Sequence, residues 1–308
     1  GSPNVHGARQ TGLQYRLDGG DVTDPESGLS SINLNPLVIE EIEITTAGAP
    51  ADRGRAVGGF ADVTTRSGGN DLDLKLALFW RGRFLDGDGA DNDDVVRFDE
   101  KPVDYHDFRF AAAGGGPIVK DRLWYFAALE VLDRKEPADQ LGTGLQIGTR
   151  GTYYFGKMTW QVNPINKLVL QVAGDPRRTG GLGLSALTSS ASGFDLEQRT
   201  VVAKLGWTAT VSPDVILEAA LTRRDTRVGV APTSNLFEPI ETALSFTSSV
   251  SGGGIEAAYP CSFMNCSEEL GERKIYQIHE STGRVGGPYY QSGDDSGTRD
   301  ALSATLSY

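Results

Sequence analysis

The strongest constraint on the fold of this chain is a set of segments in which apolar and polar residues alternate over about ten positions. In the clearest segment, residues 72–81, four leucines and Trp80 fall on one face, whereas Asp73, Lys75 and Arg81 fall on the other. Successive side chains of a β-strand point to opposite faces, so this pattern predicts a strand. The apolar face would point into the core of a soluble sandwich or outward to lipid in a membrane barrel, and one strand does not decide between them.

Connection lengths favour the membrane barrel. Similar alternation recurs at residues 105–116, 122–132, 152–162, 167–173, 199–211, 215–223 and 298–308. Short connections with turn residues (117–121, 163–166 and 212–214) alternate with long ones rich in Gly, Asp, Ser and Thr (85–104, 133–151, 174–198 and 224–297). Outer-membrane barrels have short periplasmic turns and long extracellular loops, whereas a soluble sandwich has no reason to segregate loop lengths. We predict a mainly β fold in which residues 71–308 form about eight antiparallel transmembrane β-barrel strands.

Composition agrees with this prediction. Glycine provides 39 of the 308 residues, above the roughly 7% of average usage, which suits turns and curved strands more than helices. No apolar run approaches the 18 or so residues that a membrane-spanning helix needs. The formal charge of -12 argues against nucleic acid as a partner, because no basic face is available to replace phosphate counterions.

Residues 1–70 follow a different pattern. A short strand runs into a turn at 15–20, a brief helix or loop covers 37–41, and short strands cover 42–46 and 61–65. The sequence therefore predicts a small mixed α/β domain before the barrel, with its boundary in the Gly-rich stretch 67–70.

Tryptophan positions suggest membrane interfaces. Trp124, Trp160 and Trp207 each lie within a few residues of a short turn, and Trp80 lies near the opposite end of its strand. Indole rings favour the interface between lipid and water. Ordinary cross-strand aromatic packing is the alternative explanation.

Two loop features are candidates for stabilising links. Cys261 and Cys266 are close enough in sequence to close a small disulfide loop in an oxidising compartment, or they are free thiols. An acidic run spaces carboxylates as a calcium loop does, although it lacks a well-placed distal Glu and also fits a solvated loop; its members are Asp86, Asp88, Asp91, Asp93 and Asp94.

Catalysis is not expected. His6, His106 and His279 lie in different segments without a partner at metal-ligand spacing, and the sequence has no nucleophile elbow, P-loop or dinucleotide fingerprint. We predict no cofactor, apart from the possible calcium ion.

Several motifs resemble TonB-dependent receptors of the outer membrane. Residues 12–25, which include Leu17-Asp18-Gly19, resemble a plug segment of this family, and residues 39–44 with 54–68 are similar to the motif that closes the plug. Residues 115–126 and 157–163 resemble the first barrel hairpins of the Oar-like subgroup. Arg53 departs from the family pattern, which more often has an aromatic residue there.

The resemblance implies a location and a role. It implies a multi-pass protein of the bacterial outer membrane, with long loops outside and a plug on the periplasmic side, surrounded by lipid. It also implies active uptake of an unknown extracellular ligand, with energy from TonB, ExbB and ExbD acting through a segment not present here. Surface adhesion or protein cargo export, as in Oar-like proteins, is one alternative, and a soluble secreted β-rich binding protein is another.

The predicted plug also suggests contacts and a missing part. Arg55 and Arg66 are candidates to pair with lumen-facing carboxylates such as Asp73 or Glu130, because charges in the lumen would otherwise lack partners. Eight strands enclose no room for a plug, whereas about 22 do. We therefore expect further strands after Tyr308, the alternative being a plug that sits outside a small barrel.

Overall fold

Strands dominate the fold. The structure is a computed structural model, and it describes residues 13–24, 27–46, 58–82, 85, 105–138, 145–185, 188, 192–233, 277–279, 284–286 and 293–307. Within these ranges no helix is long and apolar enough to cross a membrane. The strands form a small sheet near the N-terminus, a large sheet after it, and a separate two-stranded pair, β13 (Gln277–His279) with β14 (Arg284–Gly286).

The small sheet is mixed and has the order β2-β1-β4-β3. Its strands are β1 (Leu13–Leu17), β2 (Gly20–Asp21), β3 (Ile39–Thr45) and β4 (Gly59–Thr65), and only the β1–β4 pair is parallel. A 3-10 turn at Pro36–Val38 precedes β3 and is capped by Asn35, whose Oδ1 accepts from Leu37 N at 2.8 Å. The described part of this region, which we call the N-terminal unit (residues 13–66), contains no α-helix.

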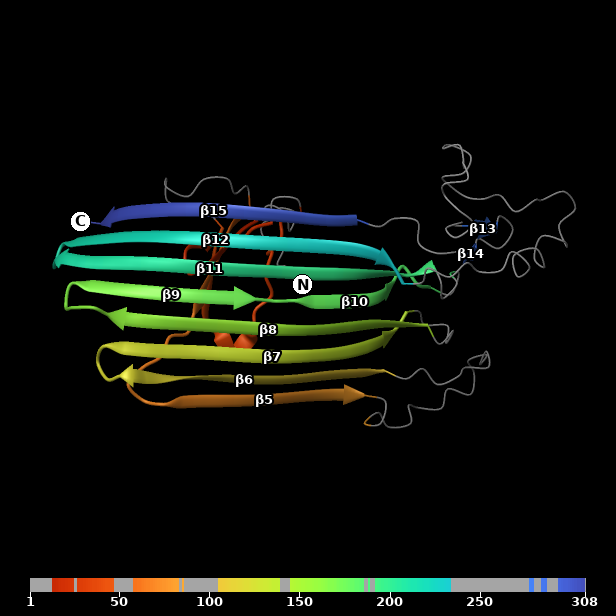
Figure 1. Cartoon of the computed structure of the whole chain (residues 1–308), viewed down its shortest axis with the longest axis horizontal. Helices are drawn as coiled ribbons and strands as arrows, with labels where there is room; N and C mark the ends of the chain where they lie inside the picture. The colour runs from red at the N-terminus through yellow and green to blue at the C-terminus, as the bar shows by residue number, and fades with distance from the viewer. Residues whose placement is uncertain are drawn as a thin grey trace, which may run out of the picture.

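The large sheet is antiparallel throughout and contains nine strands (Figure 1). The order is β15-β12-β11-β10-β8-β7-β6-β5, and β9 lies between β8 and β11 in line with β10. The strands are β5 (Asp73–Gly82), β6 (His106–Val119), β7 (Leu123–Pro137), β8 (Gln146–Gln161), β9 (Asn166–Gly174), β10 (Arg177–Leu182), β11 (Phe194–Ser212), β12 (Val215–Pro232) and β15 (Gly293–Ser307).

Short and long connections lie at opposite ends of this sheet. The turns β6–β7, β8–β9 and β11–β12 lie at the end where the C-terminus is marked, and the long connections leave from the other end (Figure 1). Each of the eight predicted strands is present. The predicted fold, an antiparallel sheet after a small mixed unit, is therefore confirmed.

Two predicted long connections are partly strand. β7 and β8 stay paired as far as Pro137 and Gln146, so most of 133–151 belongs to a continuous ladder. β10 lies inside the predicted loop 174–198 and pairs with both β8 and β11. Backbone hydrogen bonds extend these strands beyond the point where the side-chain alternation stops, which is why the pattern missed them.

The two faces of the large sheet differ in what covers them. One face carries exposed apolar side chains, such as Leu74 at 67%, Leu170 at 56%, Leu205 at 49% and Leu302 at 80% exposure; we call it the outward face. The inward face packs against the N-terminal unit. A soluble sandwich would cover both faces, so the outward face does not fit that alternative.

Candidate functional site

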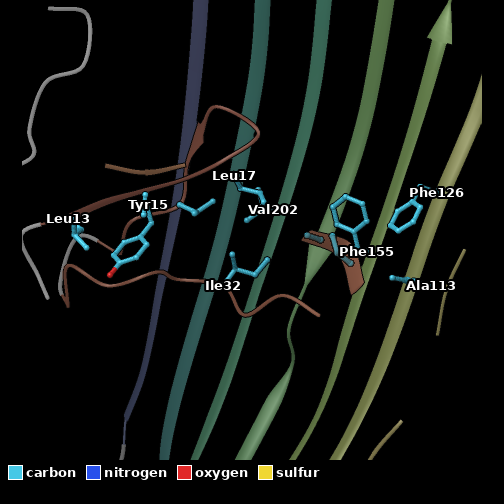
Figure 2. Packing of buried hydrophobic residues seen from close by; sticks show 13 residues of the cluster. Leu13, Tyr15, Leu17, Ile32, Ala113, Phe126, Phe155 and Val202 are labelled. Atoms are coloured by element: carbon cyan, nitrogen blue, oxygen red, sulfur yellow. The ribbon is translucent and has the colours of Figure 1, made fainter. Parts of the chain in front are cut away.

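The site with the most specific chemistry is the interface between the N-terminal unit and the inward face. Its apolar part joins residues of both units in one buried cluster, which includes Leu17 and Ile32 from the N-terminal unit and Phe126, Phe155 and Val202 from the sheet (Figure 2). The Phe126 and Phe155 rings meet edge to face, with centroids 6.0 Å apart. Small alanine side chains at inward positions of several strands leave space for the N-terminal unit. The unit therefore packs closely against the inward face.

Two lysines of the sheet converge on the turn between β1 and β2. Asp18 begins this turn with a left-handed backbone (φ 45°). Its carboxylate accepts from Thr65 N at 3.0 Å and Thr65 Oγ1 at 2.5 Å, and lies 3.7 Å from Lys157 Nζ. Lys157 Nζ also donates to Thr65 O and Oγ1, both at 3.1 Å, and Lys204 Nζ donates to Asp18 O. One turn thus binds β8 and β11 at once.

A second contact between the N-terminal unit and the sheet lies between the end of β9 and the start of β10. Asp175 Oδ2 accepts from both the backbone and the side chain of Asn33 at 2.8 Å, and its Oδ1 accepts from Thr200 N at 3.0 Å. Thr200 Oγ1 donates to Ser31 O at 2.7 Å. The interruption between β9 and β10 brings Asp175 to the interface, so a break in the strand supplies an anchor for the N-terminal unit.

A third contact involves β12 and β15. Arg299 Nη1 lies 2.9 Å from Asp21 Oδ2, and Arg224 Nη1 donates to Thr23 O. Burial raises the pKa of Asp21, but hydrogen bonds from Thr23 and Gln14 and the charge of Arg299 together outweigh burial and hold that pKa below its ordinary value of 3.8. Asp21 is therefore an ionised carboxylate at neutral pH.

The linker between the units is fixed at the short-turn end. Asn70 Oδ1 accepts from Asp121 N at 3.0 Å and from Trp124 Nε1 at 2.7 Å, and its Nδ2 donates to Asp121 Oδ1 at 2.6 Å. Asp121 has a left-handed backbone (φ 61°) in the β6–β7 turn. The predicted domain boundary at residue 70 stays a prediction, and it lies within this linker.

The predicted pairs between the two units do not occur among the described residues. Arg66 Nε donates to Ile39 O at 3.2 Å, inside the N-terminal unit, and Asp73 lies 3.6 Å from Lys75 on its own strand. Glu130 is buried on the inward face, but its Oε2 has no hydrogen-bond partner among the described residues. Arg55 lies outside the described residues. The polarity found is the reverse of the one predicted: in the first and third contacts the sheet provides the cations and the N-terminal unit the carboxylates.

Three of the four predicted interface tryptophans are on the outward face. Trp80, Trp160 and Trp207 are 51%, 45% and 39% exposed, and their role at a membrane interface stays a prediction. Trp124 instead occupies an inward position, in phase with buried Phe126, because alternation along β7 places Tyr125 outward. The predicted calcium run at 86–94 and the cysteines at 261 and 266 lie outside the described residues.

The sequence of this chain is similar to that of a known outer-membrane transporter. No protein-family model matches the chain. Over 222 residues it is 26% identical to the TonB-dependent transporter Oar of Myxococcus xanthus, a match that covers 62% of this chain and 21% of Oar. The chain belongs to the TonB-dependent outer-membrane receptor family.

Solved structures of outer-membrane transporters share the fold of this receptor. The transporter YddB of Escherichia coli matches 98% of the chain with a TM-score of 0.61 at 12% identity. The siderophore receptor PirA of Acinetobacter baumannii matches 96% with a TM-score of 0.54 at 13% identity. The chain spans 38% and 37% of these two proteins, so it corresponds to part of such a receptor.

Sequence reasoning missed the residues that make the interface. Lys157, Lys204 and Arg224 occupy inward positions of β8, β11 and β12. A cation at an inward position next to a predicted plug is a usable signal, since a buried charge needs a partner. Asp175 carried a signal as well, because Gly174-Asp175-Pro176 interrupts an otherwise regular strand.

Proposed function

We propose that this receptor takes up a ligand across the bacterial outer membrane, and that TonB, with ExbB and ExbD, supplies the energy by moving the N-terminal unit. The long connections would then face outside, and the short turns the periplasm. One observation supports this proposal above the others: the N-terminal unit lies against the inward face and is held there by polar contacts as well as by apolar packing. Water can replace such contacts when the unit moves, so separation costs less than for a purely apolar interface.

The test measures whether the inward face behind the N-terminal unit becomes accessible to a reagent from outside when energy is supplied. Thr200 is 3% exposed and contacts Ser31, so Thr200→Cys is shielded while the unit is in place. Cells producing this variant, with Cys261 and Cys266 replaced by serine, are treated with a membrane-impermeant maleimide. We expect labelling in energised cells and its loss when the proton-motive force is collapsed or TonB is deleted.

A matched control is available at the end with the long connections. Asp295 on β15 is opposite Val228 at an inward position and is exposed, so Asp295→Cys should react equally under all conditions. Labelling of Thr200→Cys that does not depend on energy or on TonB would contradict the proposal. The alternative role in adhesion or cargo export depends on the connection 224–297, most of which lies outside the described residues.

A further inference from the structure

The break between β9 and β10 leaves the register of the neighbouring strands intact. β9 and β10 lie in one line between β8 and β11 (Figure 1). Gly174 and Arg177, three positions apart, pair with positions 154 and 151 of β8 and with positions 201 and 198 of β11. Only Asp175 and Pro176 lie outside the two strands, and they can join them without a shift of register.

The carboxylate of Asp175 takes the place of a backbone acceptor in this break. Asp175 N donates to Thr200 O at 3.1 Å, as it would in a regular ladder. Thr200 N donates to Asp175 Oδ1 at 3.0 Å, whereas in a regular antiparallel pair it would donate to the backbone oxygen of residue 175. Pro176 favours an extended backbone at the residue before it. A regular pair with Thr200 is therefore available to Asp175 once its carboxylate turns away.

Asn33 of the N-terminal unit holds the carboxylate in this position. Its backbone N and its Nδ2 both donate to Asp175 Oδ2 at 2.8 Å, and Asp175 is 4% exposed. When the N-terminal unit moves, Oδ2 loses both donors. A carboxylate in such a place is costly without partners, so water or a cation has to replace them.

Arg177 is the cation that is placed to take over. It lies two residues after Asp175 at an inward position, opposite Gly151, and side chains two positions apart on a strand project from the same face. With the unit in place, its guanidinium donates to Gln198 Oε1 on the neighbouring strand. Gln198 is neutral, so the exchange of this partner for a carboxylate strengthens the contact that Arg177 makes.

We propose that Asp175 is a positioning residue that couples the docking of the N-terminal unit to β10. With the unit in place, Asp175 binds Asn33 and Arg177 binds Gln198. When Asn33 withdraws, Asp175 turns to Arg177, Thr200 N takes the backbone oxygen of residue 175 as its acceptor, and β9 and β10 close into one strand. Coupling is reciprocal, so a change imposed on β10 from the side of the long connections alters docking by the same free energy. The proposal concerns docking alone and does not depend on the proposed transport.

The test is amide hydrogen exchange over β10 in purified receptor in neutral detergent micelles. Asn33→Ala removes one of the two donors to Oδ2, which shifts Asp175 toward Arg177. We expect exchange in β10 to slow by about fivefold, the factor for one backbone hydrogen bond gained. A contact with only a structural role predicts the opposite sign, because the loss of an anchor speeds local opening of the strands beside it.

Further variants test the role of the cation. Arg177→Gln removes it, so Asn33→Ala added to this variant should no longer slow exchange in β10, whereas Arg177→Lys keeps the charge and should retain part of the slowing. Slowing that persists in the Arg177→Gln background would overturn the exchange of partners.

A matched control weakens docking elsewhere. Asp21→Asn disturbs the contact with β15 but leaves Asn33 on Asp175, so it should not slow exchange in β10. Equal slowing in Asp21→Asn, or unchanged or faster exchange in Asn33→Ala, would overturn the proposal. Unchanged circular dichroism shows that each variant is folded.

Discussion

Single side chains hold the N-terminal unit in place, and Lys157 makes the most contacts among them. Its ammonium contacts Asp18 and both oxygens of Thr65, and its side chain is 9% exposed. Lys157→Met removes these donors and leaves buried acceptors without partners. We expect the docking of the N-terminal unit to weaken by about 1–3 kcal/mol, seen as faster hydrogen exchange in β1 and β4.

Lys167→Met is the matched control for this substitution. Lys167 is exposed near the β8–β9 turn, so its replacement should not change exchange in β1 or β4. Equal protection in the Lys157 variant and the control would show that Lys157 does not hold the N-terminal unit.

Asp21 makes a contact whose strength depends on pH. Its pKa is lower in the folded protein than its ordinary value, because hydrogen bonds from Thr23 and Gln14 and the charge of Arg299 outweigh the opposing effect of burial. Stability from such a group is fully present above about pH 4 and is lost as pH falls through the folded pKa. The thermal midpoint of wild type should exceed that of Asp21→Asn at neutral pH, and the two should converge as the solution is acidified. A constant difference at all pH values would contradict this assignment.

At the scale of elements, the linker after β4 passes very close to β7. A Cβ on Gly68 would lie 2.1 Å from Tyr125 O, whereas a Cβ on Gly69 would meet nothing within 4 Å. Gly68→Ala should therefore displace the linker and lower the free energy of unfolding by about 1–3 kcal/mol, and Gly69→Ala should leave it nearly unchanged. Chemical denaturation in micelles measures both variants. Equal stability of the two would show that the linker tolerates the displacement.

The strand break between β9 and β10 shows what pattern reading misses at this scale. Residues 174–198 read as a loop because Gly, Ser and Thr are frequent and the alternation is lost. The structure pairs Arg177–Gly180 with β8 all the same. A Cβ on Gly174 would lie 2.2 Å from the ring of Tyr154. Glycine is therefore needed here because a cross-strand side chain lies close, and it does not mark a loop.

At the scale of the whole molecule, the exposed apolar side chains of the outward face determine whether that face of the large sheet meets lipid or water. Leu205 lies in the middle of β11 on the outward face. Leu205→Arg should destabilise the protein in lipid vesicles by about 2–4 kcal/mol, the cost of arginine near the bilayer midplane. Leu205→Met, which conserves volume, should cost far less. The measurement is urea unfolding from vesicles, and equal stability of both variants would show that Leu205 does not face lipid.

The sequence by itself determined the large sheet and its orientation. Alternation with period two assigns each strand its two faces, and the segregation of connection lengths separates the two ends of the sheet, so both can be read without coordinates. The motifs around Leu17-Asp18-Gly19 and residues 54–68 identified the unit that precedes the sheet.

Only the tertiary structure decided which residues join the two units. The residues that pair across the interface lie far apart in sequence: Lys157, Lys204, Asp175 and Arg299 on the sheet, and Asp18, Asn33 and Asp21 in the N-terminal unit. Their pairing depends on the depth and rotation at which the N-terminal unit packs against the inward face. Pairing by charge alone favoured Arg55 and Arg66 with carboxylates such as Asp73 or Glu130, because these charges are expected in the lumen. The packing of apolar side chains such as Phe126 and Phe155 sets the position of the unit instead, and the polar contacts form where that position allows them.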